Sequence, residues 1–192
     1  SWYGEKYLYR SRMLRYYIHT DDLKEVLRLK KIFYPKKKTL GAMELTELSG
    51  YMFEKMTGKL SPSEAYLKDR IEDVKALMEK AIEADPTNPT ALYNMARYYI
   101  NMTNFNGAMA YLDAALDAFK NARTLKKADV YKQIDSYRLK GEIFIKKQEI
   151  IKAVETFTDG ISTFKAQVPA LPGNHIIGQL YSDMADIDYF KF

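Results

Sequence analysis

Proline placement constrains the fold of this chain more than any other feature. The six prolines lie at positions 35, 62, 86, 89, 169 and 172, so residues 90–168 contain none. Proline inside a helix removes a backbone hydrogen bond and clashes with the preceding turn, so it is confined to helix ends and turns. The distribution therefore favours long helices separated by proline-containing turns.

Apolar residues recur at intervals of three and four, which is the spacing of one face of a helix. Two such stripes are clear: Leu45, Leu48, Met52 and Met56, then Ile71, Val74, Leu77, Met78, Ala81 and Ile82. Runs of β-branched residues are short, and the Asn-Gly and Asp-Gly pairs at 106–107 and 159–160 lie inside helical patterns. We therefore predict an all-α fold.

Residues 89–119 carry the clearest helical hairpin. A first helix, TALYNMARYYINM, precedes the polar turn TNFN and a second helix, GAMAYLDAALDAF. Small residues let two antiparallel helices approach closely, while large ones fill the space between neighbouring hairpins. The large residues are Leu92, Met95, Tyr99 and Leu112, and the small ones are Ala96, Ala108 and Ala115.

This order of large and small residues resembles the tetratricopeptide repeat, and residues 89–119 match every size-restricted position of that pattern. Residues 79–89, EKAIEADPTNP, resemble the end of a preceding repeat. A second copy spans residues 137–164, with Lys140 where a leucine is usual; its matching residues are Tyr137, Gly141, Phe144, Ala153, Phe157 and Gly160. The resemblance implies a right-handed α-solenoid of antiparallel helical hairpins, with about nine helices in all.

The repeats are irregular along the chain. The two clear copies are offset by 45 residues, whereas the family repeat is about 34 residues long. The excess near residues 120–136 indicates either longer helices or an inserted turn. We expect a single domain of five parts: a degenerate basic hairpin (1–38), a repeat with a long loop (39–88), the best repeat (89–130), another repeat (131–168) and a half repeat (173–192). We also expect a piece of a longer protein, because residue 1 is not methionine.

The sequence lacks the residues and motifs that several common kinds of catalytic and metal-binding site require. The chain has no cysteine, and its two histidines, His19 and His175, are far apart. No phosphate-binding loop, nucleophile elbow or zinc-binding HExxH motif occurs. Asp21 and Asp22 fit a helix cap, and the late aspartates fit a solvated or partner-facing helix surface: Asp183, Asp186 and Asp188. We expect no enzyme, no cofactor, no metal site and, for want of a long apolar run, no transmembrane segment.

The resemblance implies that the first helix of each hairpin lines a concave binding face. Carried over residue by residue, that face comprises Thr90, Tyr93, Asn94, Arg97 and Asn101, then Asp135, Arg138, Leu139, Glu142 and Lys146. Arginines there can pair with carboxylates in a forked geometry, and an asparagine can hold a peptide backbone. We expect partner contacts from Tyr93, Asn94, Arg97, Asn101, Arg138 and Glu142; the alternative is an ordinary solvated helix surface.

One known binding mode of the family is not expected. Members that capture acidic chaperone tails use a clamp of lysine, asparagine and arginine on three successive repeats. Asn94 fits one clamp position, but Asp135 and Leu139 stand where lysine and arginine are needed. Thr46 and Gly50 occupy the corresponding positions of the earlier repeat.

Positive charge is concentrated at the start of the chain. Residues 1–38 hold eleven Lys or Arg and four acidic residues, together with Trp2, six tyrosines and Phe33. Such a segment can bind an acidic protein, an anionic lipid surface or nucleic acid. The spacing of Tyr3, Tyr7, Leu14 and Tyr17 favours instead a terminal core with lysines outside. Nucleic acid is the less favoured partner, because no recognition motif is present.

These patterns together predict a protein–protein interaction scaffold or adaptor within a larger bacterial assembly. Self-association through the last half repeat is a second expectation, because it ends in aromatic residues: Tyr181, Tyr189, Phe190 and Phe192. The alternatives are a recognition domain of a larger enzyme or sensor and a binder of nucleic acid or anionic membranes through residues 1–38. In style alone, the tyrosine-rich irregular repeats also resemble spirochaete periplasmic flagellar collar proteins, which favours the periplasm over the cytoplasm.

Overall fold

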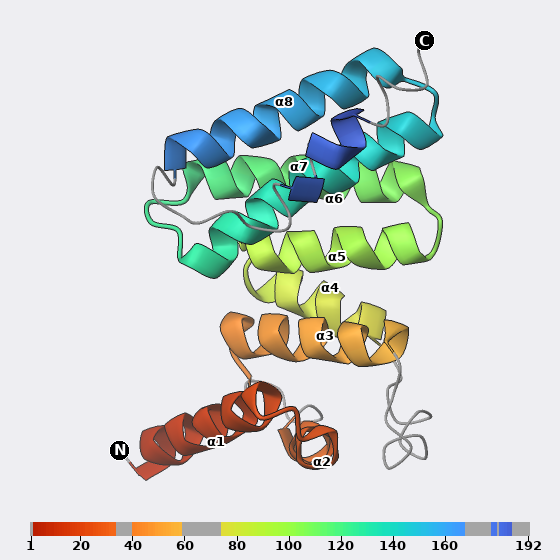
Figure 1. Cartoon of the computed structure of the whole chain (residues 1–192). Coiled ribbons are helices and arrows are strands. Elements are labelled where there is room, and N and C mark those ends of the chain that lie inside the picture. The colour runs from red at the N-terminus through yellow and green to blue at the C-terminus, as the bar shows by residue number, and fades with distance from the viewer. Residues whose placement is uncertain (1, 34–39, 59–73, 168–177, 180, 186–192) are drawn as a thin grey trace. The chain divides into compact units, whose positions relative to one another are not determined.

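The computed structural model describes residues 2–33, 40–58, 74–167, 178–179 and 181–185, with side chains from residue 8 onward. Throughout these ranges the chain forms helices, turns and loops, with no strand (Figure 1). The predicted all-α fold is therefore confirmed. Contacts divide the chain into two compact units, Ser1–Tyr98 and Tyr99–Phe192. The predicted five-part division stays a prediction.

The first unit begins with a tight helical hairpin, α1 (Trp2–His19) and α2 (Leu23–Phe33). Asp21 turns the chain with a φ of 57°, in the left-handed region that aspartate tolerates better than most residues. The carboxylate of Asp22 accepts a hydrogen bond from the backbone N–H of Glu25 at 3.1 Å. Asp22 therefore caps α2, as its position predicts, whereas Asp21 forms an ion pair with Lys55 at 2.8 Å.

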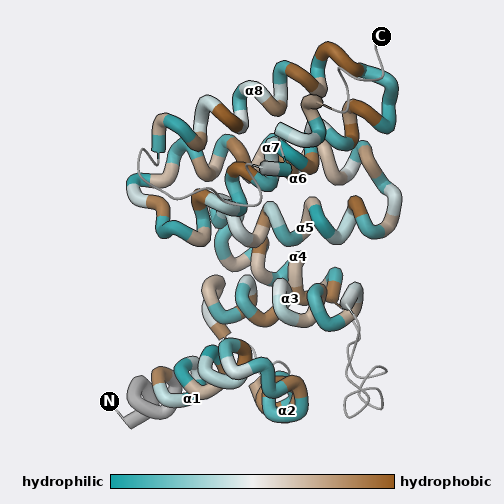
Figure 2. The backbone as a smooth tube through the Cα atoms, viewed as in Figure 1, coloured by the Kyte–Doolittle hydropathy of each residue, from teal (hydrophilic) through white to brown (hydrophobic). Residues whose placement is uncertain are grey.

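The next two helices of this unit, α3 (Ala42–Thr57) and α4 (Val74–Ala84), pack against each other. Both predicted apolar stripes supply buried residues to this core: Leu45, Leu48 and Met52 from α3, and Val74, Leu77, Met78 and Ala81 from α4. Figure 2 shows hydrophobic and hydrophilic positions interleaved along these helices. Ile71, the first residue of the second stripe, lies outside the described residues.

Helix α5 (Pro89–Asn101) starts at a proline-containing turn. The side-chain oxygen of Asn88 accepts hydrogen bonds from the backbone N–H groups of Thr90 and Ala91, both at 3.1 Å. Pro89 lacks an N–H group, but the first position of a helix has no intrahelical acceptor for one. The ADPTNP segment therefore caps α5 rather than interrupting a helix.

The second unit contains the end of α5 with α6 (Phe105–Asn121), α7 (Lys127–Lys146) and α8 (Ile150–Gln167). Helices α7 and α8 form an antiparallel hairpin (Figure 1) around a core of Val130, Ile134, Ala153, Phe157 and Ile161. Residues 178–179 and 181–185 are also helical, and Met184 packs against this core. This places part of the predicted last half repeat on the α7–α8 hairpin.

The irregular spacing of the two clear repeats has a simple structural cause. Helix α6 ends at Asn121 and α7 begins at Lys127, ten residues before Tyr137. Of the two alternatives, a longer helix is the one observed. The additional residues extend α7 at its N-terminus, and their buried members Val130, Gln133 and Ile134 add to its packed surface.

The aromatic residues of α1 are only partly buried. Leu14 is fully buried, as the helical spacing predicts, and Tyr17 is half-buried. Tyr9 and Tyr16, however, are 65% and 62% exposed. The side chains of Tyr3 and Tyr7 lie outside the described residues. No described helix combines the length and the apolar character that a bilayer span requires.

Gly141 offers a direct test of helix packing in the second unit. A Cβ atom at Gly141 would overlap the ring of Phe157, which is fully buried. We expect Gly141→Ala to lower the free energy of unfolding by about 1–3 kcal/mol, because overpacking outweighs the gain in helix propensity. Urea unfolding monitored by circular dichroism measures the change. The matched control is Gly178→Ala, where a Cβ meets no atom within 4 Å. Equal stability of the two variants would contradict this packing.

Candidate functional site

Helices α3 and α5 meet in the first unit along the face that the repeat pattern assigns to partner binding. The side-chain amide of Asn94 donates a hydrogen bond to the backbone oxygen of Thr46 at 3.3 Å. A Cβ atom at Gly50 would lie only 2.9 Å from the amide nitrogen of Asn94, so the glycine permits this approach. The first helices of two successive hairpins therefore contact each other directly.

Arg97 is the best-positioned cation on this face. Its guanidinium carbon lies 5.0 Å from the ring centroid of Phe53 and 5.6 Å from that of Tyr93. Cation–π attraction to two rings restricts the guanidinium without consuming its N–H donors. Glu54 approaches it at 3.6 Å, yet the side chain of Arg97 keeps 29% of its surface exposed. The arrangement presents a pre-oriented guanidinium at the surface, beside an exposed carboxylate.

The other predicted contact residues of α5 differ in accessibility. Tyr93 and Asn94 are buried, at 7% and 5% exposure. In the free chain Tyr93 supports Arg97, and Asn94 joins α5 to α3. Asn101 is exposed at the end of the helix. The role of these three residues in partner binding stays a prediction, but only Asn101 offers its side chain without rearrangement.

In the second unit Arg138 and Glu142 form a cluster on α7 that includes two further acids. The Nε of Arg138 donates to Asp135 at 2.8 Å, and a terminal nitrogen of the same guanidinium donates to Glu142. Asp183, from the helical residues 181–185, interacts electrostatically with both Arg138 and Glu142. Arg138 thus interacts with three carboxylates, and Lys146 supplies a second positive charge that acts on Glu142.

Burial and neighbouring charges set the proton affinities in this cluster. Burial raises the pKa of Glu142 above its ordinary value of 4.5; Arg138 opposes this, while Asp183 and Asp135 add to it. Burial alone would lower the pKa of Arg138, but Asp135 and Glu142 raise it, so its charge is retained. Arg138 therefore binds mainly within its own chain, while Glu142 lies near the positive charges of both Arg138 and Lys146.

Sequence reasoning missed the partners of both arginines. Phe53 and Glu54 lie on the first helix of the preceding repeat. Applied to that repeat, the concave-face positions would have found Glu54, which corresponds to Asn101, but not Phe53. Asp183 had no usable signal, because its contact with Arg138 depends on how residues 181–185 dock onto α7. Asp186, Asp188 and His175 lie outside the described residues, and His19 is exposed at the end of α1.

Among the described residues, no group of three or more His, Asp or Glu side chains is arranged to hold a metal ion. Asp21, one member of the acidic pair considered above, is instead paired with Lys55. Its pKa is lowered chiefly by the hydrogen bond from that lysine.

Comparison with known families supports the repeat assignment. Residues 65–128, a third of the chain, match the tetratricopeptide repeat family model. This segment therefore resembles tetratricopeptide repeats, and the predicted tetratricopeptide-like helical class is confirmed. The matched segment contains α4, α5 and α6, including the ADPTNP turn and the best repeat. Comparison with curated proteins and with solved structures found no match.

A substitution of Asn94 tests the hydrogen-bonded contact between α5 and α3. We expect Asn94→Ala to lower the free energy of unfolding by about 1–2 kcal/mol, because a buried hydrogen bond and its packing are lost. Thermal and urea unfolding measure the change. Asn101→Ala, at an exposed position of the same helix, is the control and should leave stability unchanged. A stable Asn94→Ala variant would contradict the α3–α5 contact.

The raised pKa of Glu142 predicts that the stability of the folded chain depends on pH. Because the folded chain binds this proton more tightly than the unfolded chain, stability falls as pH rises from 4.5 through the raised pKa. Glu142→Gln should therefore be more stable than the wild type near neutral pH, with the difference vanishing below that range. Unfolding free energies between about pH 4 and 8 test this. Glu155→Gln, an exposed control on α8, should show no such gain.

Proposed function

We propose that this chain is a protein-interaction scaffold or adaptor that binds a segment of a partner protein within a larger assembly. Tetratricopeptide repeats generally mediate protein–protein interaction, and residues 65–128 match that family. The proposed binding surfaces are the first helices of the hairpins, taken in each unit by itself: α3 and α5 in the first unit, and α7 in the second. In this proposal the partner protein is another component of the same assembly.

The observation that carries the proposal is the geometry of Arg97. A surface arginine ordinarily loses much side-chain freedom when it binds, which reduces the net gain. Here the rings of Phe53 and Tyr93 already restrict the guanidinium. A partner carboxylate can therefore form a forked, charge-assisted pair with less ordering cost. The proposed partner segment presents Asp, Glu or its C-terminal carboxylate to this position.

The charge of the α7 cluster suggests a different contact in the second unit. Arg138 is already paired with Asp135 and Glu142, so a partner carboxylate there would compete with two internal acids. Glu142 keeps about a third of its side chain exposed, at 34%. The proposed partner residue at this position is therefore basic, with Glu142 as its acceptor. In this proposal Arg138 orients Glu142 rather than binding the partner directly.

Arg97 provides the test of this function. The chain is used to capture partners from a lysate of its source organism at two salt concentrations, with identification by mass spectrometry. A protein captured at both concentrations is then measured against variants. We expect Arg97→Glu to weaken its binding at least tenfold, because the reversed charge repels the partner carboxylate. Arg97→Lys should weaken it less, because the charge remains while the planar fork is lost.

The matched control for this experiment is Arg123→Glu. Arg123 is exposed between α6 and α7, outside the proposed binding face. All variants are compared by circular dichroism and thermal unfolding. If Arg97→Glu folds normally and binds the captured protein as tightly as Arg123→Glu, the proposed α3–α5 binding face is wrong.

A further inference from the structure

The α1–α2 hairpin carries an exposed surface that neither its own fold nor the repeat pattern uses. Leu8, Tyr9 and Tyr16 on α1 are all more than half exposed. With Arg12 they occupy about 100° of the helix circumference, at 100° per residue. Apolar and aromatic side chains exposed side by side in this way mark a surface that contacts another phase or another molecule. We call these four residues the α1 face.

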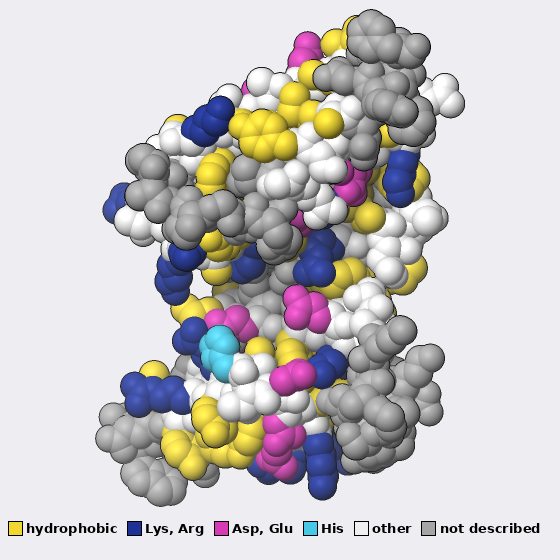
Figure 3. Space-filling model, in the orientation of Figure 1, with side chains coloured by type: hydrophobic (Ala, Val, Ile, Leu, Met, Phe, Trp, Pro, Cys, Tyr) yellow, Lys and Arg dark blue, Asp and Glu magenta, His cyan; other side chains and the backbone are white. Residues whose placement is uncertain are grey.

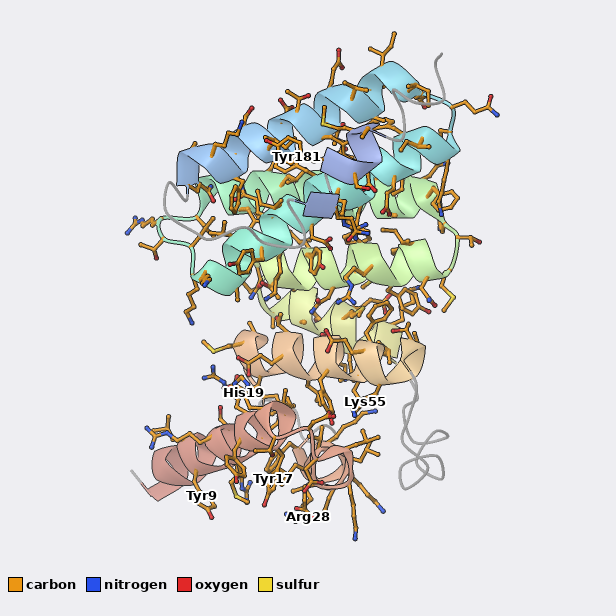
Figure 4. The ribbon with its side chains drawn as sticks, in the orientation of Figure 1. Tyr9, Tyr17, His19, Arg28, Lys55 and Tyr181 are labelled. Carbon is orange, nitrogen blue, oxygen red and sulfur yellow. The ribbon has the colours of Figure 1, made fainter. Side chains whose placement is uncertain are left out.

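The neighbouring helix adds a basic ridge to the α1 face. Lys24, Arg28 and Lys31 follow one another at intervals of four and three residues, so they align along α2, and all three are exposed. Tyr17 of α1 lies close enough to act electrostatically on Arg28. Figure 4 shows Tyr9, Tyr17 and Arg28 on the side of the hairpin away from α3. Tyr9 of the α1 face and Arg28 of the basic ridge therefore lie on the same side of the hairpin.

The positive charge of this surface is only partly neutralised within the hairpin, through the pair between Arg28 and Glu25. Its three described acids are engaged: Asp21 with Lys55, Asp22 with the start of α2, and Glu25 with Arg28. Arg12, Lys24 and Lys31 have no ion pair among the described residues. Figure 3 shows hydrophobic side chains and Lys or Arg side chains together on this part of the molecule. The complementary partner is therefore negatively charged and also accommodates apolar side chains.

We propose that the α1–α2 hairpin docks onto the surface of an anionic lipid bilayer. Tyrosine and leucine side chains enter the interfacial zone, where an aromatic ring and its hydroxyl are both accommodated. Arg12 and the α2 ridge contact the lipid phosphates, and each such cation strengthens binding to an anionic leaflet. A nucleic acid duplex would use the cations, but its bases are stacked on each other, so it would leave Leu8 and the outer surface of the tyrosines without apolar contacts. This docking is independent of the proposed partner binding on α3, α5 and α7.

Vesicle co-sedimentation of the whole chain tests the proposal. The probes are phosphatidylcholine vesicles with and without about 30 mol% phosphatidylglycerol, at about 50 and 300 mM salt. We expect binding only to the anionic vesicles, and weaker binding at the higher salt. Lys24→Ala with Lys31→Ala should reduce partitioning by roughly twenty-five-fold, about fivefold for each cation. Tyr9→Ser with Tyr16→Ser should reduce it by about tenfold, because apolar burial is lost.

Two controls make each outcome decisive. Lys120→Ala with Lys165→Ala removes the same charge from exposed positions on α6 and α8, and it should leave vesicle binding unchanged. Thermal unfolding checks that all variants fold. The proposal is overturned if anionic vesicles are not bound at low salt, if neutral vesicles are bound equally well, or if the tyrosine variant binds as the wild type does. Tight binding of a DNA duplex with no vesicle binding would assign the surface to nucleic acid instead.

Discussion

Close approach between helices is the constraint on which both units of this protein depend. At three places a glycine faces a large side chain that leaves no room for a Cβ atom: Gly50 against Asn94, Gly107 against Tyr99, and Gly141 against Phe157. In the second unit Tyr99 also stacks on Tyr111, with ring centroids 5.5 Å apart. Interiors are packed to near-crystalline density, so these small–large pairs fix which helix faces meet. The polar residues that remain outside the contacts become the surfaces available for binding.

The two arginines predicted to bind a partner illustrate how packing divides similar residues between roles. Arg97 rests on two aromatic rings and keeps part of its surface exposed, with a single acid nearby at 3.6 Å. Arg138 has acids on either side of it along α7 and a third from residues 181–185. The first is therefore suited to an external carboxylate, and the second holds its own cluster together. Two arginines on the first helices of their hairpins can therefore differ both in the charges around them and in their exposure to solvent.

Much of the architecture was predictable because it follows from local periodicity. Proline positions, the spacing of Leu45, Leu48 and Met52, and the small residues of residues 89–119 each report on one helix or one hairpin. The exposure of Tyr9 and Tyr16 was not predictable, because helical spacing alone does not show which face of α1 is covered by α2 and α3. The same reason applies to Asp183, whose partner lies 45 positions earlier in the chain. Contacts over such separations depend on docking, not on spacing.

The amino-acid sequence by itself determined the helical class, the tetratricopeptide pattern and the unequal distribution of charge. These properties arise from residue size, backbone preference and ionisation, which act over one or two helical turns. Only the tertiary structure decided that the excess residues between repeats lengthen α7, and that Asn94 is buried against α3. It also decided that Tyr9 and Tyr17 of α1 lie on the same side of the hairpin as Arg28 of α2. Each of these depends on which helix faces meet, and that is settled by the packing of the whole unit.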